Sequence, residues 1–172
     1  RSVSALFATL TVPLAYLTVR GLSMRPTSAL LAALLVIFDN ALTTQSRFIL
    51  LDAPLVFFVA ASLCSWVYFC QLDARNAFSR RWWAMLALTG VCLGLGLSCK
   101  WVGLFTMVSV AMAVAVQMWY HLGNLRLPVQ TVARHVGARA VCLGVVPLVV
   151  YMLTFAVHFK VLSLPGDGES FM

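Results

Sequence analysis

Charged side chains lie beside long apolar segments at several points of the chain, and their types suit the binding of a phosphate group. The cations among them are Arg1, Arg47 and Lys100, and the carboxylates are Asp39 and Asp52. Arginine presents a planar fork of donors to phosphate oxygens, whereas lysine presents a point charge. Three cations and two carboxylates on one face of a membrane would therefore suit a ligand that carries a phosphate.

Several of these residues, and also His158, have simpler structural interpretations that the sequence leaves open. Arg47 and Asp52 lie five positions apart and could pair with each other, because an isolated charge at membrane depth is costly. Asp39 could cap a helix or the following turn, since Asp-Asn favours both. Lys100 could extend its side chain to the membrane interface. His158 could be an ordinary interfacial residue at the end of an apolar segment.

The composition indicates a membrane protein. Of the 172 residues, 62% are hydrophobic and only 10% are charged, whereas a soluble domain is about half apolar and about a quarter charged. These values exclude a soluble domain, a disordered chain, a disulfide-rich scaffold and a nucleic-acid-binding module. The net charge of +7 then reflects membrane topology. Because the chain begins at Arg1 without an initiator methionine, we expect a fragment of a longer protein.

Six segments come near the length and apolarity that a membrane-spanning helix needs. Crossing about 30 Å of hydrocarbon takes about 20 mainly apolar residues. The candidate segments are residues 2–19, 28–38, 48–72, 82–99, 101–120 and 140–159. They predict an all-α, polytopic membrane protein with a single transmembrane domain over residues 1–172. The connection 121–139 has spaced apolar residues, which predict that part of it lies as an amphipathic helix at the membrane interface.

The distribution of Lys and Arg predicts how the spans are oriented. Because successive spans face alternate sides, eight cations fall on one side and four on the other. The first group is Arg20, Arg25, Arg75, Arg80, Arg81, Arg126, Arg134 and Arg139, and the second is Arg1, Arg47, Lys100 and Lys160. Cytoplasmic loops carry an excess of Lys and Arg, which assigns the first group to the cytoplasm. The candidate phosphate-binding residues then share the opposite side.

The glycine and cysteine patterns predict packing rather than chemistry. The stretch from Gly90 to Lys100 loosely resembles a phosphate-binding loop, but it lies within an apolar segment and lacks a preceding strand. Gly90 and Gly94 have the spacing of residues at which two membrane helices approach closely. The five cysteines form no Cys-x-x-Cys pair and no Cys/His cluster, so neither a metal site nor a disulfide framework is expected.

Three stretches carry a resemblance to a known family. They are FDNALTTQSRFILLD from Phe38 to Asp52, SCKWVGLF from Ser98 to Phe105, and the ending His158-Phe-Lys followed by Pro165-Gly-Asp-Gly. Together they resemble the protein O-mannosyltransferases, also called dolichyl-phosphate-mannose–protein mannosyltransferases. The first stretch is most similar to the second of the two animal paralogues. The motifs follow one another in the order found in the family.

The resemblance implies a fold, an activity and a partner. It implies the C-type glycosyltransferase (GT-C) fold, with several spans in the endoplasmic reticulum membrane. It implies transfer of mannose, with inversion, from dolichyl phosphate mannose to Ser or Thr hydroxyls of lumenal proteins. The lipid-linked donor is the substrate, and no further cofactor is implied. The two paralogues of the family act as a heterodimer, so the second would have protein O-mannosyltransferase 1 as its partner.

The resemblance also implies where the site lies. The chain would cover roughly the second to seventh spans, without the later spans and the lumenal loop that carries the MIR domains. The family's catalytic Asp-Glu pair lies upstream of Arg1, so no catalytic residue is expected within these 172 residues. Arg1 and Lys100 would bind or steer the donor phosphate, and His158 could reach it. The pocket would be supported by Arg47, Asp39 and Asp52.

Two other functions stay open. A transporter or channel would use Asp39, Asp52 and Lys100 as coupling groups inside the membrane. It would be expected to contain internal inverted repeats, which are not apparent in the sequence. A non-catalytic membrane subunit would contribute through the stability of its complex with a catalytic partner.

Overall fold

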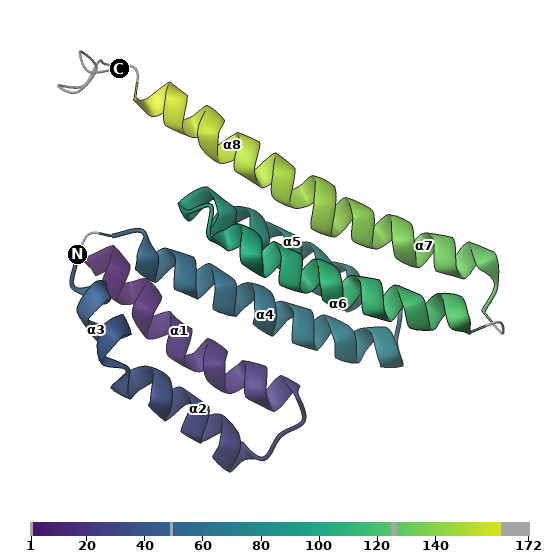
Figure 1. Ribbon diagram of the computed structural model, residues 1–172, viewed down its shortest axis with the longest axis horizontal. Helices are drawn as coiled ribbons and strands as arrows, with labels where there is room; N and C mark the ends of the chain where they lie inside the picture. Colours follow the sequence, from purple (N-terminus) through teal and green to yellow (C-terminus); the bar gives the residue numbers. More distant parts are fainter. Residues whose placement is uncertain (1, 49, 125–126, 163–172) are drawn as a thin grey trace.

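The apolar segments form long helices, because an α-helix satisfies its own backbone polar groups where no water is available. The computed structural model describes residues 2–48, 50–124 and 127–162. Its helices are α1 (Ser2–Gly21), α2 (Pro26–Phe38), α3 (Asn40–Ser46), α4 (Asp52–Arg75), α5 (Arg80–Cys99), α6 (Gly103–Gly123), α7 (Val129–Ala140), the π-helical turn η1 (Val141–Val145) and α8 (Val146–Val161). Figure 1 shows them side by side in one bundle of long helices.

The helices agree with five of the six expected spans, and the second corresponds to a bent pair of shorter helices. Five helical segments are long and apolar enough to cross a membrane. The second span is broken, because α2 and α3 meet at an angle of 53° around Asp39. This break explains why the apolar stretch 28–38 is too short for a straight span. The chain is therefore a multi-pass, all-helical membrane protein.

The prediction for the connection 121–139 is wrong in its geometry. The helix α7 is amphipathic, as expected, but it continues through η1 into α8 as one long helix rather than lying along the membrane surface (Figure 1). Its residues His135 and Arg139 are buried against neighbouring helices. Burial of polar partners, which single-helix periodicity cannot reveal, draws α7 into the bundle.

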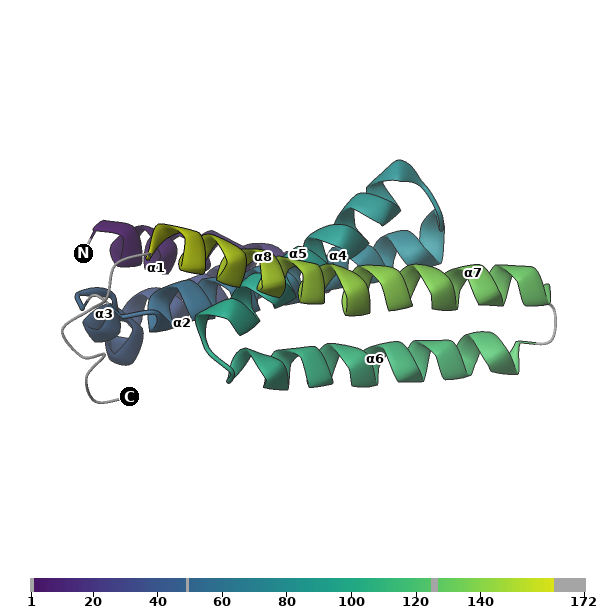
Figure 2. The same cartoon turned by 90° about the horizontal axis from the view of Figure 1, so that it is seen from above.

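The packing order places α4 and α5 at the centre of the bundle. α4 lies between α1 and α5, α2 covers α1, and α8 packs on the other side of α5. α6 packs on α4 and α5 and, near its end, on α7. Figure 2 shows α6 running alongside the long helix formed by α7 and α8. The largest fully buried side chains include Trp82, Phe69 and Leu86, where α4 and α5 meet.

The two glycines of α5 allow the close approach that their spacing predicts. A Cβ atom on Gly90 would overlap the carbonyl oxygen of Cys142 in η1. A Cβ atom on Gly94 would lie 2.8 Å from the carbonyl oxygen of Pro147 in α8. The backbones of α5 and of the last long helix therefore touch, which fixes where the end of α8 lies relative to α5.

The helix ends divide into two groups. The start of α1, α3, residues 100–102 and the end of α8 lie at one end of the bundle, here called the Lys100 end (Figure 1). The connections 22–25 and 76–79 and the start of α7 lie at the other, here called the basic end. Arg25 lies in the first of these connections, Arg20, Arg75 and Arg80 lie in the helix turns beside them, and Arg134 lies on α7. Among the described residues, these cations lie at the opposite end of the bundle from Arg47, Lys100 and Lys160, which is the grouping that the sequence predicts.

Candidate functional site

Lys100 and Asp52 form an ion pair at the Lys100 end. Asp52 is the first residue of α4, and Lys100 directly follows the last residue of α5. Because α4 and α5 run antiparallel, the start of one lies beside the end of the other. The Nζ atom of Lys100 donates a hydrogen bond to Oδ1 of Asp52 at 2.6 Å. The expected pair between Arg47 and Asp52 is therefore replaced by one between residues far apart in sequence.

The pair leaves the lysine ammonium accessible. The side chain of Lys100 is 54% exposed, whereas that of Asp52 is 23% exposed. An ammonium group has three N–H donors, and the bond to Asp52 uses one of them. The carboxylate also lies at the positive end of the α4 dipole, which attracts a negatively charged side chain. Asp52 can thus hold Lys100 in place while other donors face an anionic ligand.

Asp39 has the capping role that the sequence left as one of its interpretations. Its carboxylate accepts hydrogen bonds from the backbone N–H groups of Ala41 at 3.2 Å and Leu42 at 3.3 Å. Its backbone carbonyl accepts a bond from the Thr43 hydroxyl at 3.0 Å. These contacts start α3 directly after α2 and hold the bend between them. Asp39 therefore determines how α3 is placed at the Lys100 end.

Of the other predicted residues, Arg47 and His158 have exposed side chains at the Lys100 end. Arg47 caps the end of α3, and its side chain is exposed. His158 is exposed in the last turns of α8. It lies four positions after Thr154, whose hydroxyl donates to that of Ser98 at 2.9 Å, so α8 holds His158 at the same end as Lys100. Arg1 lies outside the described residues.

An apolar groove begins at Leu104, four residues after Lys100 in the sequence. It has a volume of about 450 Å³ and lies between α6 and the helix formed by α7 and η1, with Leu93 of α5 at its base. Its α6 wall extends from Leu104 to Met118, which is about 21 Å along the helix at about 1.5 Å per residue. Every residue that lines it is apolar except Arg139, at the end towards the basic loops. Its shape and polarity suit a hydrocarbon chain.

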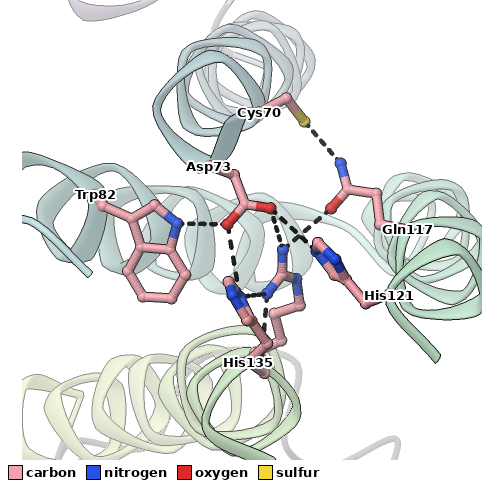
Figure 3. A network of polar contacts seen from close by, with 7 residues as sticks. Cys70, Asp73, Trp82, Gln117, His121 and His135 are labelled. Carbon is pink, nitrogen blue, oxygen red and sulfur yellow. Dashed lines mark hydrogen bonds and ion pairs between the residues drawn. The ribbon is translucent and has the colours of Figure 1, made fainter. Parts of the chain in front are cut away.

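A second polar cluster, which the sequence analysis did not predict, surrounds Asp73 near the basic end (Figure 3). Its Oδ1 atom accepts a hydrogen bond from Nε1 of Trp82 at 2.7 Å, and its Oδ2 atom accepts one from Nη2 of Arg139 at 2.8 Å. The rings of His121 and His135 place nitrogen atoms 3.5 and 3.6 Å from the same carboxylate. Four helices, α4, α5, α6 and α7, thus meet at a single acidic side chain.

Arg139 is the main partner of Asp73. Its side chain is only 2% exposed, and that of Asp73 is 9% exposed. Besides Asp73, the guanidinium contacts Nδ1 of His135 at 2.9 Å and donates to Oε1 of Gln117 at 3.3 Å. In the sequence, Arg139 is one of the cations that predict the membrane orientation. The four-residue spacings from Gln117 to His121 and from His135 to Arg139 each place two polar groups on one helix face, and this signal could have revealed the cluster.

The cluster fits an ion pair better than a metal centre. Asp73, His121 and His135 offer ligand atoms that lie within 4.8 Å of one another, and such side chains can ligate zinc. However, the guanidinium of Arg139 contacts both Asp73 and His135. A permanent cation already neutralises the carboxylate, and a divalent ion beside it would be repelled. The cluster is therefore a buried ion pair with hydrogen-bonded neighbours.

The chain matches one protein family over nearly its whole length. A family model described as dolichyl-phosphate-mannose-protein mannosyltransferase matches residues 1–163. The chain belongs to this family. It is 41% identical over 172 residues to dolichyl-phosphate-mannose–protein mannosyltransferase 1 of Candida albicans, covering all of this chain and 19% of that protein. It is 42% identical over 159 residues to protein O-mannosyl-transferase 2 of Danio rerio, covering 92% of this chain and 21% of that protein.

A solved structure has the same fold. The protein O-mannosyltransferase Pmt1-Pmt2 complex of S. cerevisiae, bound to the sugar donor, matches with a TM-score of 0.90 and 37% identity. The match covers 97% of this chain and 22% of that one. The expected family and the expected helical GT-C fold are thus confirmed. The chain spans about a fifth of the length of the curated relatives it matches.

Proposed function

We propose that the full-length protein transfers mannose from dolichyl phosphate mannose to Ser or Thr hydroxyls of proteins in the endoplasmic reticulum lumen, with inversion at the sugar. The observation that carries the proposal is the match of nearly the whole chain, at a TM-score of 0.90, to a mannosyltransferase complex bound to its sugar donor. The names of the sequence relatives support the same activity.

In this proposal the described helices bind the donor. As the glycosidic bond breaks, negative charge develops on the phosphate oxygen that leaves with the lipid. A cation aimed at that oxygen stabilises the charge in the transition state. Lys100 has this role, because its ammonium is exposed while Asp52 fixes its position. Asp39 acts indirectly, by fixing the bend before α3.

The apolar groove receives the hydrocarbon chain of the donor. Leu104, at the start of its α6 wall, lies four positions after Lys100. A phosphate bound at Lys100 would therefore have its lipid chain at the entrance of the groove. Burying such a chain contributes about 25 cal/mol for each Å² of apolar surface removed from water, so a long chain adds affinity that is independent of the phosphate.

The remaining candidates have supporting roles. Arg47 and His158 lie at the Lys100 end and add positive or polar character to the entrance of the site. Arg1 is proposed as a further phosphate contact on the sequence resemblance alone. The base that removes the proton of the acceptor hydroxyl is proposed to belong to the family's Asp-Glu pair, which the resemblance places before Arg1. The lipid donor is the sole non-protein reactant proposed.

The proposed partner is a paralogue, protein O-mannosyltransferase 1. The similar yeast structure, a complex of Pmt1 with Pmt2, supports an assembly of two related chains. An exposed apolar surface is abundant on this chain, notably on α6 and α8. In the full-length protein, this apolar surface can be covered by lipid, by later spans of the same chain or by the partner subunit.

The activity is tested with the full-length protein and its paralogue in microsomes from cells that lack both. Labelled dolichyl phosphate mannose is the donor, and a Ser/Thr-containing peptide is the acceptor. We expect labelled mannose on Ser or Thr, with the anomeric configuration opposite to that of the donor. Microsomes that bind the donor but transfer no mannose would contradict the proposal. Solute uptake without transfer would instead support the transporter.

A further inference from the structure

We propose that Asp73 and Arg139 are positioning residues whose buried ion pair sets the width of the apolar groove and thereby the enzyme's preference for donors with long lipid chains. The inference rests on the proposed function, because it concerns the chain of the same donor. The residues involved, here called the Asp73 clasp, are Asp73, Trp82, Gln117, His121, His135 and Arg139.

The clasp joins the two walls of the groove. One wall is α6, which contributes Gln117 and His121, and the other is α7, which contributes His135 and Arg139. Arg139 donates to Oε1 of Gln117 at 3.3 Å. The rings of His121 and His135 stack with their centroids 4.8 Å apart. These contacts cross directly from one wall to the other (Figure 3).

Asp73 anchors both walls to the centre of the bundle. It lies on α4, and the Trp82 indole of α5 donates to it at 2.7 Å. The same carboxylate then holds Arg139 at 2.8 Å. Because α4 and α5 lie at the centre of the bundle, these contacts fix the position of α7 relative to its most buried part.

Arg139 belongs to the clasp and to the groove at once. It is the one polar residue among those that line the groove. Its guanidinium lies 5.1 Å from the centroid of the Phe69 ring. Its Nε atom is buried without a hydrogen-bond partner among the described residues. Because Arg139 is held in place by these contacts, it forms the closed end of the groove. A lipid chain that enters from the Lys100 end can therefore extend only as far as Arg139.

The width of the groove depends on the clasp because of the way α6 packs. α6 packs on α4, α5 and α7, while α8 packs on α5. Both walls of the groove thus rest on α5, and at the basic end the clasp supplies direct side-chain contacts between them. A loosened clasp would let α6 move away and would remove contacts along the lipid chain. The loss would grow with the length of chain in the groove, while the phosphate at Lys100 would be unaffected.

The test measures donor KM and kcat in the full-length protein assembled with its paralogue. It uses dolichyl phosphate mannose and a mannosyl phosphate donor whose lipid is too short to reach Arg139. The variants are Asp73→Asn, Arg139→Met and the double variant, and the matched control is Arg134→Met, a neighbouring arginine of α7 outside the clasp. We expect each single variant to raise KM for the long donor about tenfold, with KM for the short donor and kcat unchanged.

The double variant separates positioning from folding. It removes both buried charges, so its thermal unfolding midpoint should recover towards that of the wild type. Its KM for the long donor should stay raised, because Gln117 has lost the guanidinium. Recovery of both quantities together, or an equal rise in KM for the two donors, would overturn the inference. Absence of any mannosyl transfer by the wild type would overturn the proposed function instead, and the inference with it.

A distance measurement does not depend on catalysis. Spin labels at Met112 of α6 and Leu148 of α8, both exposed, report the separation of the two helices in the full-length protein. We expect the distance distribution to broaden and lengthen in Asp73→Asn and Arg139→Met but not in Arg134→Met. An unchanged distribution in the first two variants would overturn the inference even if their activity fell.

Discussion

The Nζ atom of Lys100 lies 2.6 Å from Oδ1 of Asp52, across the adjoining ends of two antiparallel helices. The two residues are 48 positions apart. Each belongs to one of the two longer motifs that carry the family resemblance, FDNALTTQSRFILLD and SCKWVGLF. The fold thus joins these two motifs at one ion pair, beside the entrance of an apolar groove.

Replacing Asp52 by Asn should affect binding of the donor more than stability. Lys100 is half exposed, and pairs of this kind contribute about 0–1 kcal/mol. The ammonium of the variant would lose its anchor, so we expect KM for the donor to rise several-fold while the thermal unfolding midpoint changes little. Asp52→Glu, which keeps the charge, is the control. A large fall in the midpoint without a change in KM would assign Asp52 to folding alone.

Removing the cap at Asp39 should loosen α3. Asp39→Ala deletes the acceptor of the Ala41 and Leu42 N–H groups, and losing such a cap costs about 1 kcal/mol. Hydrogen exchange at these two amides should become faster, whereas Asp39→Ser, which can still cap, should stay close to the wild type. Equal protection in Asp39→Ala and the wild type would show that the bend is held by other contacts.

A glycine pair offers a test of the packing between α5 and the last long helix. Gly90→Ala would push a methyl group into the Cys142 carbonyl, and overpacking of this kind typically costs about 1–3 kcal/mol. Gly137→Ala on α7 meets nothing within 4 Å, and alanine favours helix over glycine by about 1 kcal/mol. The thermal unfolding midpoint in detergent should therefore be lower than that of the wild type for Gly90→Ala and not for Gly137→Ala. A similar midpoint in both would contradict the close backbone contact between α5 and η1.

The indole of Trp82 should stabilise the Asp73 clasp through its N–H group. Trp82→Phe removes the donor that lies 2.7 Å from the carboxylate, and a hydrogen bond to a charged group contributes about 1.5–3 kcal/mol. Trp83→Phe is a matched control, because Trp83 is 42% exposed on the neighbouring position. Denaturant unfolding should separate the two variants by at least about 1 kcal/mol. Equal free energies of unfolding for the two variants would show that the Trp82 N–H group does not stabilise the clasp.

The sequence predicts the helices well because membrane crossing requires long apolar runs, and these are visible residue by residue. It predicts the close contact at Gly90 and Gly94 for a similar reason, since small residues four apart define one face. It does not predict that Asp52 pairs with Lys100 rather than with Arg47. That choice depends on the register of α4 against α5, which apolar periodicity leaves undetermined.

The Asp73 clasp cannot be predicted from the sequence for a different physical reason. Arg139 and the two histidines have the types expected of a polar connection at the membrane surface. Arg139 is buried by contacts with Asp73 of α4 and Gln117 of α6, which lie far from it in the sequence. A charge count groups Arg139 with the other cations of the basic end but cannot tell a solvated arginine from one that is 2% exposed. The prediction of an interfacial helix over part of 121–139 fails for this reason.

The most direct test of the donor site compares Lys100→Ala with Lys160→Ala in the full-length protein assembled with its paralogue. Both lysines lie at the Lys100 end, but Lys160 is placed on the last turn of α8 and has no proposed contact with the phosphate. Mannosyl transfer from labelled dolichyl phosphate mannose is measured as kcat/KM for the donor. We predict a loss of about 100-fold for Lys100→Ala and a value near that of the wild type for Lys160→Ala. Equal kcat/KM in Lys100→Ala and the wild type would contradict the assignment of the donor phosphate to Lys100.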